Sequence, residues 1–255
     1  MIKTLRNHKL LIAYDGTPFA GWQIQGKKPT VQGHLEQVLA RCWGHHVTLY
    51  GSGRTDAGVH AHGQVAHFRA EPKFRDFSSL QSALNFYLPR EIRILQAKYA
   101  PETFHSRFSA KGKEYRYRIA QVPFLDPFEI NRAWHVPRKL DIDAMEKAGQ
   151  LFVGTHDFAS FTSNPGYKRE TTVRSIRSVR FQQQGTILAI SFRGEGFLYR
   201  MVRNLVGALV KIGHGRITQQ ELKKILEAHS RSAAPNTAPA CGLYLEKVFY
   251  TDRYV

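Results

Sequence analysis

The segment Gly51–Ala61 carries the densest group of residues that could do chemistry. It reads GSGRTDAGVHA, and its glycines allow the backbone to turn tightly and to come close to a ligand. Arg54 and Asp56 lie two residues apart, so such a loop would present one guanidinium and one carboxylate together. A site that holds a ligand and acts on it with this charged pair fits the pattern. An ordinary glycine-rich hairpin, with Asp56 bonded to its own backbone, fits equally well.

Phosphate and metal chemistry fit the neighbourhood of this loop poorly. Asp56 stands where a dinucleotide-binding GxGxxG loop has its third glycine, and the chain contains no GxxxxGK[ST] motif. Histidines close to the loop are His45, His46, His60, His62 and His67. They come without an HExxH motif or a cysteine pair. We therefore expect solvated or core histidines and no metal.

A basic strand and a basic helix are the other candidate features. In Lys111–Arg118, alternation puts Tyr115 and Tyr117 on one strand face and arginines on the other. Such rings and guanidinium groups suit stacked bases and phosphates, although a half-buried strand with tyrosines in the core is the more common arrangement.

The amphipathic helix predicted around Met201–Val210 carries Arg200, Arg203 and Asn204 away from its apolar stripe. A solvated helix face explains these residues. In the alternative interpretation, Arg203 is buried and pairs with a catalytic carboxylate, which a nearby cation keeps ionised.

The composition favours a folded protein with a polyanionic partner. The chain has 255 residues, 42% of them hydrophobic, and 37 Lys and Arg against 20 Asp and Glu give a net charge of +17. We find no signal peptide and no membrane span in the sequence. Cys42 and Cys241 are expected to be free thiols in the cytoplasm.

The hydrophobic patterns predict an α+β fold with the order β-α-β-β-α-β in the first half. Its predicted strands are Lys9–Tyr14, Val47–Tyr50, Gln64–Arg69 and Ile92–Tyr99. A helix capped by Thr30 follows the first strand, and a helix opened by Ser78 and Gln81 follows the third. This order is that of a ferredoxin-like unit.

The second half repeats the order. Its predicted strands are Glu114–Ile119, Ser175–Phe181, Thr186–Arg193 and Leu243–Tyr250, with helices beginning near Asp141 and Leu198 and an extra helix at Thr218. We expect a domain of residues 1–105 that carries the Asp56 loop and a domain of residues 106–255 that carries Tyr115 and Arg203. Residues 230–240 are expected to form a long surface loop. From the pattern alone, the halves could enclose a groove or simply stack.

Several segments resemble the tRNA pseudouridine synthase A (TruA) family. The segments, in chain order, are GRTDAGVHA (53–61), FHSRFSAKGKEYRYRI (104–119), GTHDFASF (154–161), FLYRMVRNLVG (197–207) and APACGLYLEKV (238–248). The resemblance covers essentially the whole chain. It implies a pseudouridine synthase fold, with two ferredoxin-like halves whose sheets merge across a central basic RNA-binding cleft. The chain departs from the family at Ser52, where alanine is common, and at Cys241.

The resemblance also implies residue roles. Asp56 matches the catalytic nucleophile, Arg203 its salt-bridge partner, Arg54 the residue that displaces the target base, and Tyr115 the ring that packs against the target uracil. The implied activity is an isomerase that converts uridine to pseudouridine at positions 38, 39 and 40 in the anticodon arm of tRNA, as a homodimer. Because no group is lost and no electron moves, this reaction requires no cofactor or metal.

Alternatives stay open at this stage. The first attack of Asp56 could be at C1′ of the ribose or at C6 of the ring. A non-catalytic RNA-binding module would use the same charge and Tyr115, and a metal-dependent phosphoryl-transfer enzyme would use Asp56 as a ligand.

Overall fold

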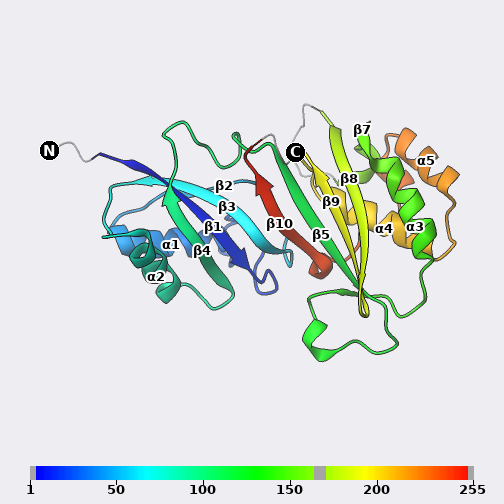
Figure 1. Cartoon of the computed structure of the whole chain (residues 1–255), viewed down its shortest axis with the longest axis horizontal. Helices are drawn as coiled ribbons and strands as arrows, with labels where there is room; N and C mark the ends of the chain where they lie inside the picture. The colour runs from blue at the N-terminus through cyan, green and yellow to red at the C-terminus, as the bar shows by residue number, and fades with distance from the viewer. Residues whose placement is uncertain (1–3, 164–170, 252–255) are drawn as a thin grey trace. The chain divides into compact units, whose positions relative to one another are not determined.

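The computed structural model describes residues 4–163 and 171–251, which divide into two compact units. Unit 1 comprises the described residues up to Lys111 together with the segment from Tyr244 onward, and unit 2 comprises Gly112–Leu243. Figure 1 shows their helices and strands, coloured along the chain. Both units combine helices with a mixed sheet, so the mixed helix and strand content expected from the sequence is confirmed.

Unit 1 has the predicted β-α-β-β-α-β order and, in addition, the final strand of the chain, which the sequence analysis placed in the second half. Its elements are β1 (Arg6–Tyr14), α1 (Val31–Trp43), β2 (Tyr50–Gly51), β3 (His60–Ala70), α2 (Phe77–Tyr87), β4 (Ile92–Tyr99) and β10 (Leu243–Phe249). Strand β1 lies between β3 and β4 and is antiparallel to both. Strand β2 pairs antiparallel with β3, and β10 pairs parallel with the start of β3. Helices α1 and α2 lie next to each other against this sheet (Figure 1).

The core of unit 1 lies between this sheet and its two helices. Leu10, Ile12 and Phe68 from the sheet are completely buried, and so is Leu39 of α1. Each fully buried side chain of this kind contributes roughly 1.5–3 kcal/mol relative to an exposed one. From His8 onward, buried and half-buried residues alternate along β1, as expected for a strand with one face toward the helices.

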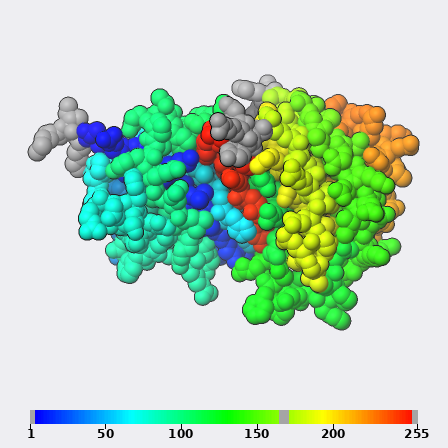
Figure 2. All heavy atoms as spheres, viewed as in Figure 1, coloured from blue at the N-terminus to red at the C-terminus, as the bar shows by residue number. Residues whose placement is uncertain are grey.

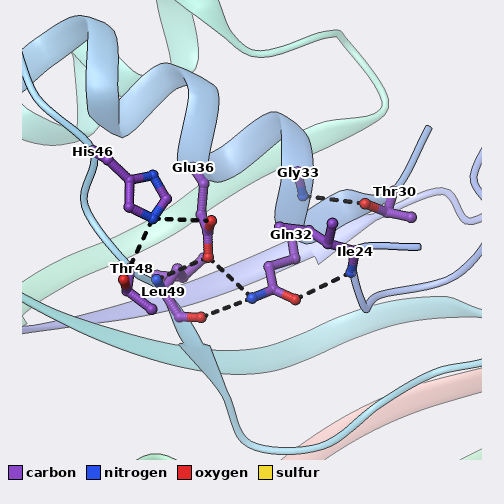
Figure 3. A network of polar contacts seen from close by, with 8 residues as sticks. All are labelled: Ile24, Thr30, Gln32, Gly33, Glu36, His46, Thr48 and Leu49. Atoms are coloured by element: carbon purple, nitrogen blue, oxygen red, sulfur yellow. Dashed lines mark hydrogen bonds and ion pairs between the residues drawn. The ribbon is translucent and has the colours of Figure 1, made fainter. Parts of the chain in front are cut away.

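Helix α1 carries a buried polar network that fastens the segments on either side of it (Figure 3). Thr30 caps the helix by accepting a hydrogen bond from Gly33 N. The carboxylate of Glu36 accepts from Leu49 N and from Gln32 Nε2, both at 3.0 Å. Gln32 Oε1 in turn accepts from Ile24 N. The network ties the chain just before β2 to the helix.

Two predicted details of unit 1 are wrong. Val47–Tyr50 is not a strand, because Leu49 N bonds the Glu36 carboxylate and β2 begins only at Tyr50. The cap of α2 is Asp76, whose Oδ1 accepts from Ser79 N, rather than a capping box at Ser78. Gln81 instead donates its side-chain N–H groups to carbonyl groups of β4.

Unit 2 contains the remaining elements. They are β5 (Gly112–Ala120), β6 (Trp134–His135), α3 (Ile142–Gly149), β7 (Gly154–Asp157), β8 (Val173–Gln184), β9 (Ile187–Gly194), α4 (Met201–Gly213) and α5 (Gln219–Glu227). The short 3₁₀ turns are Pro127–Glu129, Gln150–Phe152, Ala159–Phe161, Arg231–Ala233 and Ala240–Gly242. The sheet order is β5-β9-β8-β7 with antiparallel pairs, and β6 runs parallel to β5. Helices α3 and α4 pack against each other beside this sheet (Figure 1).

Most predicted elements of unit 2 are present with longer strands. The β8–β9 hairpin turns at Gly185, whose φ of +57° a glycine adopts without strain. The capping box at Thr218 and Glu221 is confirmed at the start of α5. The short strands β6 and β7 were not predicted, since two to four residues give no usable periodicity.

One loop of unit 2 stands clear of its packed layers. The segment between β5 and β6 appears in green at the lower edge of the space-filling view (Figure 2). Val122 and Leu125 pack on a small cluster around Ala120, whereas Phe124 and Phe128 are 90% and 85% exposed.

Among the described residues, no helix is both long and apolar enough to cross a membrane. Both cysteines are thiols.

The Glu36 network generates a stability prediction. Glu36→Ala removes the acceptor of Leu49 N and one of the two acceptors of the Gln32 amide, and we expect it to lower the free energy of unfolding by about 1–3 kcal/mol. Urea denaturation measures this loss. Glu36→Gln is the control, because its amide oxygen still accepts, and it should be less destabilising. Equal stability of Glu36→Ala and the wild type would contradict the assignment.

Candidate active site

The Arg54–Asp56 loop connects β2 to β3, as the sequence predicted. Val59 N donates to Asp56 O at 3.1 Å and closes a turn in which Gly58 has a φ of +75°. Most side chains tolerate such a φ poorly, which explains the glycine. The Arg54 side chain is exposed and Asp56 is half-buried, so both are accessible from solvent on one short loop.

Thr55, between these two residues, is anchored in the core of unit 1. It is 7% exposed, and its hydroxyl shares a hydrogen bond of 2.8 Å with the hydroxyl of Tyr14, the last residue of β1. Its carbonyl accepts from Trp22 N at 3.1 Å. Burial raises the pKa of Tyr14, so the phenol stays protonated and available for this bond. Arg54 and Asp56 therefore project from either side of a fixed residue.

Close backbone packing reinforces this anchor. A Cβ on Gly21, whose φ is +98°, would lie 2.5 Å from Thr55 O. A Cβ on Gly16 would lie 2.0 Å from Val59 O. Both contacts are shorter than any side chain permits, so the segment Tyr14–Trp22 fits under the loop only with glycine at these positions. Sequence reasoning missed this segment, and its two glycines were the available signal.

The start of the loop is held by β3. Ser52 Oγ donates to Gln64 Oε1 at 2.7 Å, and Gln64 Nε2 donates to Gly53 O at 3.0 Å. Ser52 and Gln64 are completely buried. Ser52, which the sequence analysis singled out as a departure from the family, thus takes part in fixing the loop.

Of the five histidines near the loop, His60 and His67 are buried, and the others are exposed. His60 Nδ1 accepts from Gly16 N and lies 3.2 Å from the Asp15 carboxylate, and its ring stacks on Tyr244. Burial lowers the pKa of His67 to about 4, so this ring is neutral at pH 7. No cluster of three or more metal-ligating side chains occurs within residues 4–163 and 171–251.

Tyr115 lies in β5 of unit 2 with its ring edge-to-face against Phe197, at a centroid distance of 5.1 Å. It is 8% exposed, and Tyr117 on the same face is completely buried. The contact of Tyr115 with a substrate base stays a prediction. Tyr117 donates its hydroxyl proton to Pro239 O at 2.8 Å. Arg118, on the opposite face, pairs with Glu129 at 2.8 Å.

Arg203 is fixed to the chain segment that follows α5. Its Nε donates to Ala238 O at 2.8 Å, and Ala238 N donates back to Arg203 O at 3.1 Å. One residue, Ala238, thus holds both the guanidinium group and the backbone of Arg203. The remaining guanidinium nitrogens are directed by this bond, because the group is planar and rigid.

The segment 230–240 is packed rather than a loose surface loop, which corrects the sequence-based expectation. Asn204 is completely buried, not solvated, and its Oδ1 accepts from Thr237 Oγ1 at 2.6 Å and from Arg231 Nη2 at 3.3 Å. A Cβ on Gly207 would lie 2.1 Å from Asn236 O. Residues 231–238 therefore form a strap along α4 that ends at the partner of Arg203.

The four predicted site residues fall into two groups. Arg54 and Asp56 share one loop of unit 1, whereas Tyr115 and Arg203 belong to unit 2. The pairing of Asp56 with Arg203 stays a prediction.

Comparison with known proteins shows which family this chain is similar to. A sequence profile described as tRNA pseudouridine synthase matches residues 10–109 and 148–251. The protein named tRNA pseudouridine synthase A in Methylacidiphilum infernorum is 47% identical over 243 residues, which are 95% of this chain and 95% of that protein. The protein of that name in Halalkalibacterium halodurans is 47% identical over 92% of this chain and 89% of its own length. A third, from Afipia carboxidovorans, is 43% identical over 95% of this chain and 99% of its own length.

The chain belongs to the tRNA pseudouridine synthase family. The matched ranges include Arg54, Asp56 and Arg203, while Tyr115 lies between them. They also include Tyr14, Gly21 and the strap, the parts that hold the candidate site residues in place.

The strap generates a prediction about Arg203. Gly207→Ala forces Asn236 away from α4, and we expect it to displace Ala238 and with it the Arg203 guanidinium. Overpacking of this kind costs about 1–3 kcal/mol of stability. Thermal unfolding should show that loss, and the activity of the folded variant should fall through kcat more than through KM. Unchanged stability and activity would contradict the role of the strap.

Proposed function

We propose that the protein is an isomerase that converts uridine to pseudouridine in tRNA, within the anticodon arm at positions 38, 39 and 40. The observation that carries this proposal is family membership over nearly the full length, together with a carboxylate presented on a loop fixed from three sides. The net charge of +17 suits a polyanionic substrate.

The reaction needs no external reagent. The N1–C1′ bond breaks, the uracil turns, and a C5–C1′ bond forms, while the hydrogen on C5 leaves as a proton and N1 gains one. With attack at C1′, a carboxylate nucleophile splits this exchange into two steps: its bond to C1′ forms as the N1–C1′ bond breaks, and that bond breaks as the C5–C1′ bond forms. We assign this role to Asp56, with first attack at C1′ or at C6.

Arg54 and Tyr115 help to bring the target base out of its stack and to hold it. A base must leave its stack before it reaches a carboxylate, at a cost of a few kcal/mol. Arg54 is exposed beside Asp56 and can occupy the vacated position, since its guanidinium group stacks and hydrogen-bonds with neighbouring bases. Tyr115 offers a ring that packs against the extruded uracil.

Arg203 is proposed as the salt-bridge partner of Asp56. A guanidinium group keeps a carboxylate ionised when substrate excludes water from the site. The bond from Nε to Ala238 O supports this role, because it fixes the orientation of the planar guanidinium group.

We further propose the arrangement that such a site requires. Both units would be ferredoxin-like, which the order β4-β1-β3 with β2 beyond it supports for unit 1, and their sheets would merge across a basic cleft that holds the RNA. The protein would act as a homodimer in the cytoplasm, where tRNA is modified.

Release of tritium from tRNA labelled at uracil C5 tests this function, because the new C5–C1′ bond expels that hydrogen. We expect the wild type to release label and Asp56→Ala to release it at least about 10³-fold more slowly, since the nucleophile is absent. Equal release by the variant would contradict the role of Asp56.

Two controls separate the alternatives. Asp56→Asn keeps the shape of the side chain and should be as inactive as Asp56→Ala, because an amide is a poor nucleophile. A chelator should leave the wild-type rate unchanged, whereas a metal-dependent enzyme would lose activity. Tight tRNA binding by the wild type without release of label would indicate a binding module.

A further inference from the structure

Unit 1 carries an exposed cluster of tilted rings outside the Arg54–Asp56 loop. Phe108 is 76% exposed, and its ring lies 4.4 Å from that of His105, with 34° between their planes. His105 lies 5.7 Å from the ring of Tyr50, which is itself 49% exposed. We call the rings of Tyr50, His105 and Phe108 the Phe108 platform.

The platform is rigid, because its backbone is held by its own hydrogen bonds. Arg107 N and Phe108 N both donate to His105 Nδ1, at 3.1 and 3.3 Å. His105 N donates to Ser109 Oγ, and Ser109 N donates to His105 O. An exposed aromatic side chain on so fixed a turn binds a planar ligand with little loss of conformational entropy.

Ser106 anchors this turn to the sheet. Its N–H donates to His67 Nδ1 at 3.1 Å, and its hydroxyl donates to Tyr50 O at 2.6 Å. Its carbonyl accepts from the hydroxyl of Tyr250 at 2.7 Å. Burial, followed by the charge of Arg107, lowers the pKa of His105, so the ring behind Phe108 is neutral at pH 7.

The charge around the platform suits a nucleotide. Arg107 is exposed, with its guanidinium carbon 5.6 Å from the centre of the Phe108 ring. Because this guanidinium group is exposed, it can contact a phosphate. Phe86 of α2 is 79% exposed and forms a comparable group with Tyr87 and Arg41, but it is not bonded to β2 as the Phe108 turn is. Phe128 follows Asp126 and precedes Glu129, so carboxylates flank it in the chain.

The platform also lies close to the reacting loop. Tyr50 begins β2, and Asp56 follows it by six residues, which span at most about 20 Å. An RNA whose uridine reaches Asp56 therefore has neighbouring nucleotides within range of Phe108.

We propose that the Phe108 platform stacks an unpaired nucleobase of the substrate RNA other than the target uridine, while Arg107 contacts an adjacent phosphate. The inference rests on the proposed function for the identity of that RNA. Phe108 is thus a binding residue rather than a catalytic one.

Binding of tRNA tests the proposal in the Asp56→Ala background, where turnover does not interfere. Filter binding should show that Phe108→Ala raises the Kd for tRNA about tenfold, because a stacked base contributes about 1–3 kcal/mol. Phe108→Leu should weaken binding to a similar extent, and Phe108→Trp should retain it. The matched control is Phe124→Ala, which removes an equally exposed ring and should leave the Kd unchanged.

Three results would overturn the proposal. The first is an unchanged Kd in Phe108→Ala, and the second is full binding by Phe108→Leu. The third is a loss of self-association in Phe108→Ala that accounts for its weaker binding. That result would mean that the ring contacts a second copy of the chain. Failure of the proposed function is read separately, because the wild type would then form no pseudouridine whatever the effect of Phe108 on binding.

Discussion

The position of the candidate nucleophile depends on how Thr55 is held. Thr55 is buried, and it lies in the chain between Arg54 and Asp56, whose side chains must reach solvent and substrate. It is held by a hydrogen bond between its hydroxyl and that of Tyr14, and by one from Trp22 N to its carbonyl. Hydrogen bonds in a buried site are strong because water does not compete for them. The loop can therefore be glycine-rich and still present Arg54 and Asp56 in a single geometry.

The same solution recurs around the other candidate residues. Arg203 is directed by a backbone carbonyl at the end of a packed strap, and Phe108 is carried by a turn that Ser106 ties to β2. The Glu36 network fixes Leu49, the residue immediately before β2, through a hydrogen bond to helix α1. Arg203 and Phe108 are thus accessible side chains on segments whose backbone groups are hydrogen-bonded within the protein. A rigid frame lowers the entropy that must be lost when substrate is positioned.

Local patterns made much of this predictable from the sequence. Periodic apolar residues located both helices of unit 1 and the amphipathic helix that carries Arg203, and the glycines and charges of residues 51–61 singled out the loop of Asp56. The details that failed depend on contacts between residues distant in sequence. Leu49 leaves the strand pattern because a carboxylate 13 residues away accepts its N–H, and Asn204 is buried because the strap, about 30 residues further on, covers it. Gly16 and Gly21 are visible in the sequence as glycines, but only the structure shows that they are needed for close packing against Val59 and Thr55.

The most direct test of this account is a double-mutant cycle of Tyr14→Phe and Thr55→Val, read as the single-turnover rate of pseudouridine formation at saturating tRNA. Both substitutions remove the same hydrogen bond and leave every proposed catalytic group in place. We predict that each single variant slows the reaction about tenfold or more, since small displacements of a reacting group have large effects, and that the double variant is no slower than either. Rates equal to the wild type, or losses that simply multiply in the double variant, would contradict the claim that this bond positions Asp56.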